Sequence, residues 1–223
     1  MHNKIGILNC YSDEPIFGPS AKLFVNSIPN STIINYCHGE EIYDIHQFDG
    51  YIVSGSHSCH KDQDRWITNL KEIIKQIYNK HIPCLAVCFG HQVIADMFGG
   101  TTIKNYAGEE GFQDVPTKVE EVCVRLFTGL PNPVKVYQSH NDAVIKAPPG
   151  SIQVINNKKC VQYYQYGSIY SIQSHPEIDI VTAKRFAKRD NKNVKTVLKG
   201  VNERNIQSYK ILKNFLKIVE NSI

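Results

Sequence analysis

Cys88 stands at the end of a short apolar run over residues 83–87 and has small residues, Ala86 and Gly90, two positions away on each side. This small-x-nucleophile-x-Gly pattern is typical of a strand that turns sharply into a helix, with the nucleophile at the tip of the turn. The helix that we expect over 90–98 would place its positive end beneath the sulfur, which favours the reactive thiolate. The alternative is a buried structural cysteine, since free cysteine is among the most buried residue types.

A histidine and a glutamate form the second candidate pair. His175 and Glu177 close another strand-like run over 168–174, with Pro176 between them. A cysteine nucleophile needs a base, and histidine is the side chain whose unperturbed pKa lies near neutrality. In an extended chain, positions two apart share a face, so the carboxylate can reach the imidazole and orient it. Alone, this pair would be an ordinary solvated one; together with Cys88 it predicts a catalytic triad.

Both segments resemble the diagnostic motifs of one family. Cys-Phe-Gly-His-Gln at 88–92 and Ser-His-Pro-Glu at 174–177 are similar to those of the class I (triad-type) glutamine amidotransferases, and the resemblance covers roughly residues 4–180. It implies a Cys88–His175–Glu177 triad. Such a triad attacks the γ-amide of a glutamyl substrate, forms a γ-glutamyl thioester and hydrolyses it.

The resemblance extends to the loop after a predicted strand. Residues 48–56 look like the family's strand and glycine-rich loop, with Ser56 where the family has glycine. This implies that the backbone amides of Ser56 and Phe89 act as the two oxyanion donors, a pair worth a few kcal/mol of transition-state stabilisation. Outside the family, the loop would be a plain turn after a strand.

The substrate contacts are also carried over from the family. Gln92 falls where the family uses a glutamine to hold the amino-acid end of the substrate, and Gly55 belongs to the glycine-rich loop. Ser139 and His140 lie in a segment, 138–142, that resembles the Ser-His-x-Asp loop whose backbone helps to bind the glutamyl carboxylate. Without the family context, His140 would more often be a surface histidine.

A second group of metal-ligand residue types lies nearby. His57, Cys59 and His60 are close in sequence, and Cys84 is four residues from Cys88. Zinc sites usually show closer paired spacing, so we expect no metal and no other cofactor. Cys84 is predicted to pack in the core, and the cluster at 57–60 to lie near the mouth of the site.

Composition bounds the class of protein. The chain has 223 residues, is 42% hydrophobic and carries a formal net charge of +4, which together indicate one folded domain over 1–223 without a nucleic-acid groove. No signal peptide opens the chain, and no run approaches the roughly 18 apolar residues of a membrane helix. Seven cysteines, an odd number, suggest reduced thiols. We therefore expect a cytoplasmic protein that binds neither nucleic acid nor membrane.

The hydrophobic pattern predicts an α/β fold with a mostly parallel central sheet, helices on both faces and added antiparallel hairpins. The resemblance to the family implies the same kind of fold, which is flavodoxin-like. In the first half, the pattern predicts strands at 5–8, 32–36, 51–53 and 83–87 and helices at 20–27 and 64–80. From residue 121 it changes to short runs that we interpret as hairpins: 122–126, 134–137, 153–155, 161–164 and 169–173.

Residues 179–223 are predicted to form a helical C-terminal extension. An apolar stripe that should pack back on the domain comprises Ile206, Tyr209, Leu212, Phe215, Leu216 and Val219. The lysines of this extension are expected to form a solvated face, and the alternative is a docking surface for a partner protein.

Three functions fit these features. The first is a stand-alone γ-glutamyl hydrolase or peptidase that acts on glutamine or a γ-glutamyl peptide or conjugate. The second is the glutaminase subunit of a two-chain synthetase of the GMP synthetase type, with ammonia passed to the synthetase partner. The third is a non-catalytic binding module, against which the complete triad argues. The loop at 54–57 and the C-terminal extension favour the first.

Overall fold

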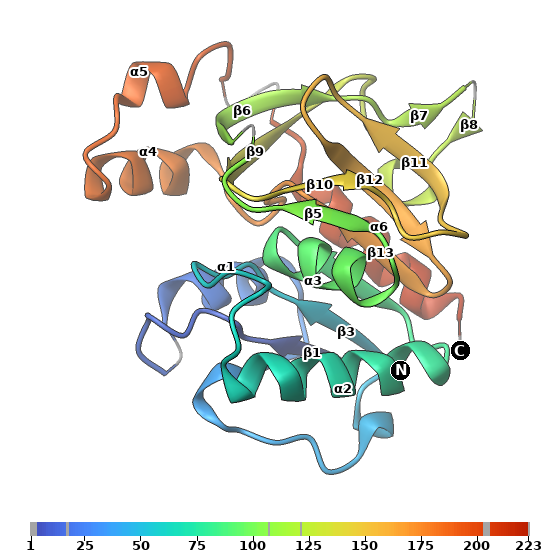
Figure 1. Ribbon diagram of the computed structural model, residues 1–223. Coiled ribbons are helices and arrows are strands. Elements are labelled where there is room, and N and C mark those ends of the chain that lie inside the picture. The colour runs from blue at the N-terminus through green and yellow to red at the C-terminus, as the bar shows by residue number, and fades with distance from the viewer. Residues whose placement is uncertain (1–3, 17, 107, 121, 203–205, 223) are drawn as a thin grey trace.

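A twisted seven-stranded sheet lies at the centre of the protein, in a computed structural model that describes residues 4–16, 18–106, 108–120, 122–202 and 206–222 (Figure 1). Every pairing from β13 to β2 is parallel, whereas β11–β12 and β12–β13 are antiparallel. The strands across the sheet are β11 (Ile152–Asn156), β12 (Val161–Tyr166), β13 (Ile169–Ile172), β4 (Cys84–Val87), β3 (Gly50–Val53), β1 (Ile5–Leu8) and β2 (Ser31–Ile34). The predicted parallel core is therefore confirmed.

Helices cover both faces of this sheet. On β4, Leu85 and Val87 point to one face and Cys84 and Ala86 to the other, as the alternation of a strand requires. The first face is covered by α1 (Pro19–Ser27) and α6 (Tyr209–Glu220), and the second by α2 (Arg65–Asn79) and α3 (Phe89–Met97). Cys84 is completely buried, which agrees with the core role expected for it.

Three two-stranded ribbons form sheets of their own beside the central sheet. They pair β5 (Thr101–Ile103) with β10 (Ala143–Lys146), β6 (Glu109–Val115) with β9 (Val134–His140), and β7 (Lys118–Val119) with β8 (Val122–Cys123). The sequence pattern did not predict β5, β6, β7 or β10. For β6 the reason is its acidic and glycine-rich start, which disfavours a strand until β9 pairs with it.

One of the expected hairpin strands needs correction. The run at 122–126 is only the two-residue β8, followed by a short 3-10 helix, η3 (Arg125–Phe127), because Phe127 turns inward to pack beside Tyr163. The run at 169–173 is β13, which forms the expected antiparallel hairpin with β12 and also pairs in parallel with β4, so this hairpin is part of the central sheet. The predicted strand at 32–36 also ends early, because Tyr36 begins another 3-10 helix, η1 (Tyr36–His38). A third 3-10 helix, η2 (Ile45–Gln47), precedes β3. Residue 121, where we expected the pattern to change, lies outside the described residues.

The C-terminal extension is helical, as expected, and contains α4 (Ile180–Arg189), α5 (Val194–Val197) and α6. The buried stripe of α6 differs from the predicted one: Ile211 and Ile218 are buried, whereas Tyr209 is 42% exposed, at the first turn of the helix. Asn214 anchors α6 by donating to the carbonyls of Leu126 and Thr128, both at 2.9 Å. In Figure 1, α4 and α5 stand beside the β6–β9 ribbon, away from α6.

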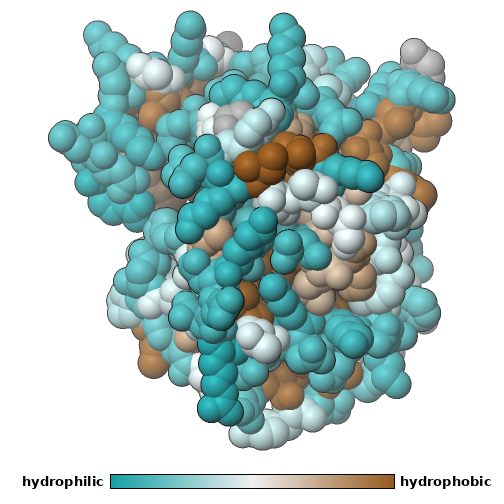
Figure 2. Space-filling model, viewed as in Figure 1, coloured by the Kyte–Doolittle hydropathy of each residue, from teal (hydrophilic) through white to brown (hydrophobic). Residues whose placement is uncertain are grey.

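Polar side chains cover most of the face seen in Figure 2, with small apolar areas between them. The exposed large apolar residues come from separate elements, among them Tyr43, Val122 and Val181. Within the described ranges, none of the helices has the length and apolar character needed to cross a membrane.

His91 connects α3 to the antiparallel side of the sheet. Its Nδ1 lies 2.8 Å from the hydroxyl of Ser171 and its Nε2 lies 3.1 Å from the carbonyl oxygen of Val161. A carbonyl only accepts, so Nε2 carries the proton and Nδ1 accepts from the serine hydroxyl. Burial lowers the pKa of His91 to about 3, so the imidazole is neutral in the folded protein.

This buried imidazole predicts a pH-dependent loss of stability. From pH 6.5 down to about 3 the unfolded chain binds a proton at His91 and the folded protein does not, so stability is present above this window and falls as the pH drops. The slope is up to about 1.4 kcal/mol per pH unit. The variant His91→Gln keeps a donor and an acceptor without the titration. We expect the difference in unfolding free energy between wild type and variant, measured by urea denaturation, to shrink steadily between pH 7 and pH 4; a constant difference would contradict this.

Candidate functional site

The turn at Cys88 is strained. Cys88 has φ +50° and ψ −99°, outside the regions that side-chain-bearing residues favour, and it joins β4 directly to α3. At Gly90, an added Cβ would lie 2.9 Å from the carbonyl oxygen of Val53, so α3 can start this close to β3 only with glycine there. The structure thus has the tight strand-to-helix turn that the sequence pattern predicts.

The parallel neighbour of β4 brings the second motif to this turn. The backbone N–H of Cys88 donates to the carbonyl of Ile172, the last residue of β13, at 2.9 Å. His175 follows three residues later, and its own backbone N–H donates to Tyr137 of β9 at 2.8 Å. Its Nδ1 lies 2.7 Å from Oε1 of Glu177. Cys88, His175 and Glu177, predicted together from separate motifs, are each less than 10% exposed.

The electrostatics of this group favour a charged imidazole. Burial opposes protonation, but the charges of Glu177 and Cys88 and their hydrogen bonds to the ring outweigh it and hold the pKa of His175 well above its usual value. Because Nδ1 is bonded to Glu177, Nε2 is the nitrogen left for the thiol. The Cys88 Sγ also lies 3.8 Å from the carbonyl oxygen of Ser139. This arrangement can move a proton between thiol and imidazole and can present a thiolate to an electrophilic carbon.

The loop after β3 lies against the same histidine. At Gly55, an added Cβ would lie 2.8 Å from Cε1 of His175 and 2.6 Å from the hydroxyl of Tyr11, so glycine is required for this close approach. Ser56 lines the cavity beside Cys88, and its Oγ accepts from the N–H of Ser58 at 3.0 Å. The Phe89 ring packs toward Trp66, with centroids 5.7 Å apart, while its backbone N–H is the first of α3.

A cavity of about 440 Å³ opens beside Cys88 and His175. Of the predicted substrate-binding residues, Gln92, Ser139 and His140 line it. Each is held by the protein: Gln92 Nε2 donates to the Asp142 carbonyl at 2.9 Å, and His140 Nδ1 donates to the same carbonyl at 2.9 Å. Ser139 donates to Glu110 at 3.2 Å. The predicted residues therefore share one hydrogen-bonded wall.

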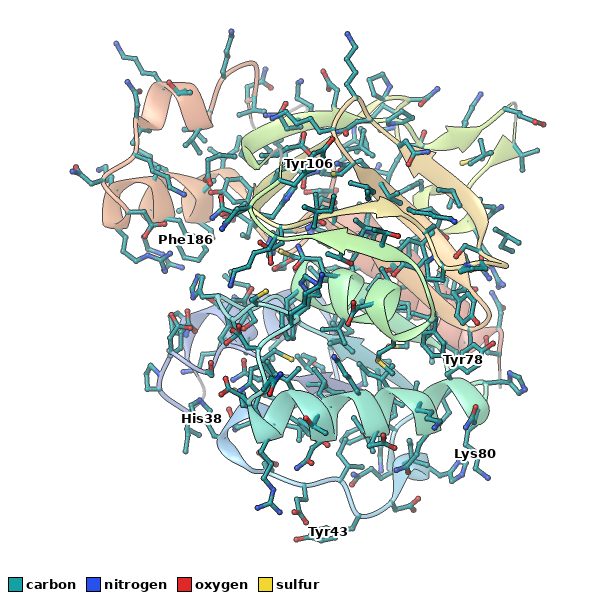
Figure 3. The ribbon with its side chains drawn as sticks, in the orientation of Figure 1. His38, Tyr43, Tyr78, Lys80, Tyr106 and Phe186 are labelled. Carbon is teal, nitrogen blue, oxygen red and sulfur yellow. The ribbon has the colours of Figure 1, made fainter. Side chains whose placement is uncertain are left out.

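Other residues of the cavity were not predicted. Tyr11 follows β1 at the same sheet edge as Cys88, a position that could have marked it from the sequence, and burial together with Glu177 raises its pKa well above the usual value. Phe186 and Arg189 come from α4, part of the C-terminal extension, in which we predicted no site residue. Figure 3 shows Phe186 on the side of α4 that is turned toward the N-terminal half of the chain.

One salt bridge holds this part of the extension at the cavity, and another lies within the extension. Lys192 donates to Glu110 of β6 at 2.7 Å, and Tyr137 donates to the other carboxylate oxygen at 2.8 Å. Arg189 forms a two-point contact with Asp190, at 2.6 and 3.1 Å. The far wall of the cavity therefore carries both cationic and anionic side chains.

Two groups of side chains have the residue types of a metal site. In one, Cys59, His60 and Asp142 bring their ligand atoms within 4.8 Å of one another; in the other, Glu109, His140 and Cys160 do so. His57 is in neither group, because its Nδ1 pairs with Asp13 at 2.7 Å on the surface.

Comparison with known proteins agrees with this geometry. The family model described as glutamine amidotransferase class-I matches residues 21–191. The chain is 36% identical over 155 residues to one subunit of the glutamine-hydrolyzing GMP synthase of Methanosphaera stadtmanae, covering 68% of this chain and 77% of that protein. It is 25% identical over 191 residues to gamma-glutamyl peptidase 3 of Arabidopsis thaliana, covering 78% of this chain and 76% of that protein.

A longer curated protein and a solved structure are also similar to this chain. The GMP synthase of Borrelia garinii is 33% identical over 131 residues, and the match covers 58% of this chain and only 24% of that protein. A glutamine amidotransferase of Thermotoga maritima has the same fold, with a TM-score of 0.80 at 19% identity over 98% of each chain. Because the family model spans most of the chain and both predicted motifs lie within it, the chain belongs to the class-I glutamine amidotransferase family.

Proposed function

We propose that this protein hydrolyses a γ-glutamyl amide bond with Cys88 as the nucleophile. The observation that carries the proposal is the buried His175–Glu177 pair against a thiol in a strained turn. His175 accepts the thiol proton, and the sulfur attacks the γ-carbonyl carbon. The resulting oxyanion accepts hydrogen bonds from two backbone N–H groups. One belongs to Phe89, directly after the Cys88 turn, and the other to Ser56, directly after Gly55.

The second half of the reaction reuses the same groups. The tetrahedral intermediate expels the amine as His175 returns the proton to it, and a γ-glutamyl thioester remains on Cys88. Water then attacks the thioester carbon while His175 takes a proton from the water. The carbon–sulfur bond breaks, His175 returns the proton to the sulfur, and glutamate leaves. Glu177 keeps the imidazole oriented and stabilises its charged form through the 2.7 Å hydrogen bond.

The substrate's amino-acid end is assigned to the wall formed by Gln92, Ser139 and His140. These residues lie on the cavity surface and are fixed by the Asp142 carbonyl and by Glu110. Fixed polar groups orient a ligand at a smaller entropic cost than mobile ones.

The leaving-group side favours a substrate larger than glutamine. The cavity holds about 440 Å³ and is closed on the far side by α4 through Phe186 and Arg189 and by Lys192 after it. A leaving amino acid or peptide has a carboxylate that can take the place of Asp190 at Arg189 or of Glu110 at Lys192, whereas ammonia has none. The similarity to a gamma-glutamyl peptidase supports the same choice, a stand-alone γ-glutamyl peptidase or hydrolase that needs no cofactor.

The second candidate is a glutaminase subunit that passes ammonia to a separate synthetase. The observation that favours it is the 36% identity to a subunit of a glutamine-hydrolyzing GMP synthase over 77% of that protein. In this case L-glutamine is the substrate, and turnover rises when the synthetase binds. Either candidate uses the same chemistry at Cys88.

Removal of the nucleophile tests the shared chemistry. We expect Cys88→Ala to lower glutamate release from L-glutamine and from γ-glutamyl peptides by about 10³-fold or more, because the thioester cannot form. Cys123→Ala is the matched control, since Cys123 is an exposed thiol on β8. Equal activity of Cys88→Ala and wild type would rule out the mechanism.

The carboxylate behind the histidine predicts a shift in the pH profile. Glu177 helps to raise the pKa of His175, so Glu177→Gln should let the imidazolium lose its proton at lower pH. If the reactive form is the thiolate–imidazolium pair, the alkaline limb of kcat/KM moves to lower pH and the maximum falls by about 10²-fold. An unchanged alkaline limb would show that Glu177 does not act through His175.

A substitution in α4, where it lines the cavity, distinguishes the two candidate functions. We expect Arg189→Ala to raise KM for γ-glutamyl dipeptides by up to about fivefold, as for an exposed ion pair, and to leave KM for L-glutamine unchanged. Lys188→Ala on the same helix is the control, because Lys188 is exposed and does not line the cavity. If dipeptides are not cleaved at all while glutamine is, the synthetase-subunit function is favoured.

A further inference from the structure

Cys59, His60 and Asp142 meet at the edge of the cavity although they come from two distant loops. The Cys59 Sγ lies 3.2 Å from Asp142 Oδ2, the His60 Nδ1 lies 3.5 Å from the same oxygen, and Sγ and Nδ1 are 3.9 Å apart. A tetrahedral Zn²⁺ ion has ligands about 2.0–2.3 Å from the metal, which places ligand atoms about 3.3–3.6 Å from one another. The three distances lie within about 0.3 Å of this range, so a small shift of the side chains would bring the atoms to three corners of a zinc tetrahedron.

The histidine of this group lacks a good partner. His60 is completely buried, and its Nε2 has no hydrogen-bond partner within the part of the chain that the structure describes. Its Nδ1 faces Asp142 at 3.5 Å and Cys59 at 3.9 Å, longer than a normal hydrogen bond. A buried imidazole nitrogen without a short hydrogen bond is costly, and an ion bound at Nδ1 would give that nitrogen a partner, while Nε2 would keep its proton.

The surroundings also hold Cys59 and Asp142 in place and leave both accessible from the cavity. Asp142 Oδ1 accepts from the N–H of Asn105 at 3.0 Å, which orients Oδ2 toward the other two. The N–H of Cys59 donates to Asp62 at 2.8 Å. Cys59 and Asp142 line the cavity, so an ion can enter and a fourth ligand, a water molecule, can bind from that side.

A second cluster provides a comparison. Glu109 Oε2 lies 3.3 Å from His140 Nε2 and 3.5 Å from Cys160 Sγ, so its spacing is similar. There, however, the amide of Gln162 donates to Glu109 at 2.7 Å and to Cys160 at 3.1 Å, and Asn157 donates to the other oxygen at 2.9 Å. These groups already satisfy one another, and the cluster needs no ion.

We propose that Cys59, His60 and Asp142 form a binding site for a thiophilic divalent cation of the zinc class, with one coordination position open to the cavity. The site goes beyond the hydrolytic function. The ion would connect the loop that follows Gly55 and Ser56 to the loop of Asp142, whose carbonyl holds Gln92 and His140. We therefore infer that bound metal stiffens the wall assigned to the substrate's amino-acid end.

The test uses the full chain with Cys88→Ala, so that the thiol of the hydrolytic site contributes nothing. We expect this protein to bind one equivalent of Zn²⁺ in equilibrium dialysis, and Co²⁺ to give the near-ultraviolet absorption of one thiolate ligand. Adding Cys59→Ser should weaken Zn²⁺ binding by about tenfold or more and abolish that absorption. Adding Cys160→Ser, in the second cluster, should leave both unchanged.

Other outcomes overturn the proposal. Failure of the Cys88→Ala protein to bind Zn²⁺ would do so, as would binding that persists after Cys59→Ser or is lost after Cys160→Ser. Asp142→Asn serves as a second ligand variant if Cys59→Ser does not fold, because Asn retains an oxygen for the Asn105 amide; it should also weaken Zn²⁺ binding about tenfold. None of these readouts depends on hydrolysis, so failure of the proposed function would not affect them.

Discussion

The parallel pairing of β13 with β4 is the constraint on which the site depends. The two strands end together, with Val87 opposite Ile172, so the thiol at the turn and the histidine beyond β13 reach the same edge of the sheet. A one-residue slip of this register would turn every side chain of β13 to the opposite face. The register is stabilised on both faces, by buried Ile172 on one side and by the Ser171–His91 hydrogen bond on the other.

A second constraint acts through one backbone carbonyl. The carbonyl of Asp142 accepts hydrogen bonds from both Gln92 on α3 and His140 on the preceding strand, so these two cavity residues share a single acceptor. The side chain of the same residue faces Cys59 and His60. A change at Asp142 therefore affects both the wall assigned to the substrate and the proposed cation site. This is the physical reason to expect the two to influence one another.

The C-terminal extension divides into two parts with different roles. Helix α6 belongs to the core, where Phe215 packs under the sheet and Asn214 caps the carbonyls of the η3 region. Helix α4 instead stands over the cavity and is held there by the Lys192–Glu110 salt bridge. The size and charge of the leaving group that the cavity accepts depend on this second part, and the chemistry at Cys88 does not.

Local sequence patterns determined much of this protein. The apolar run and the small residues around Cys88 predicted the strained turn, the spacing of His175 and Glu177 predicted their hydrogen bond, and the alternation of apolar runs predicted the parallel sheet, because each depends on residues close in the chain. Only the tertiary structure decided which loops meet. The pairing of acidic β6 with β9, the approach of α4 to the cavity and the meeting of Asp142 with Cys59 and His60 all join segments far apart in sequence. Such contacts depend on packing and register, which no local pattern encodes; for that reason the proposed cation site rests on the folded structure and not on the sequence pattern.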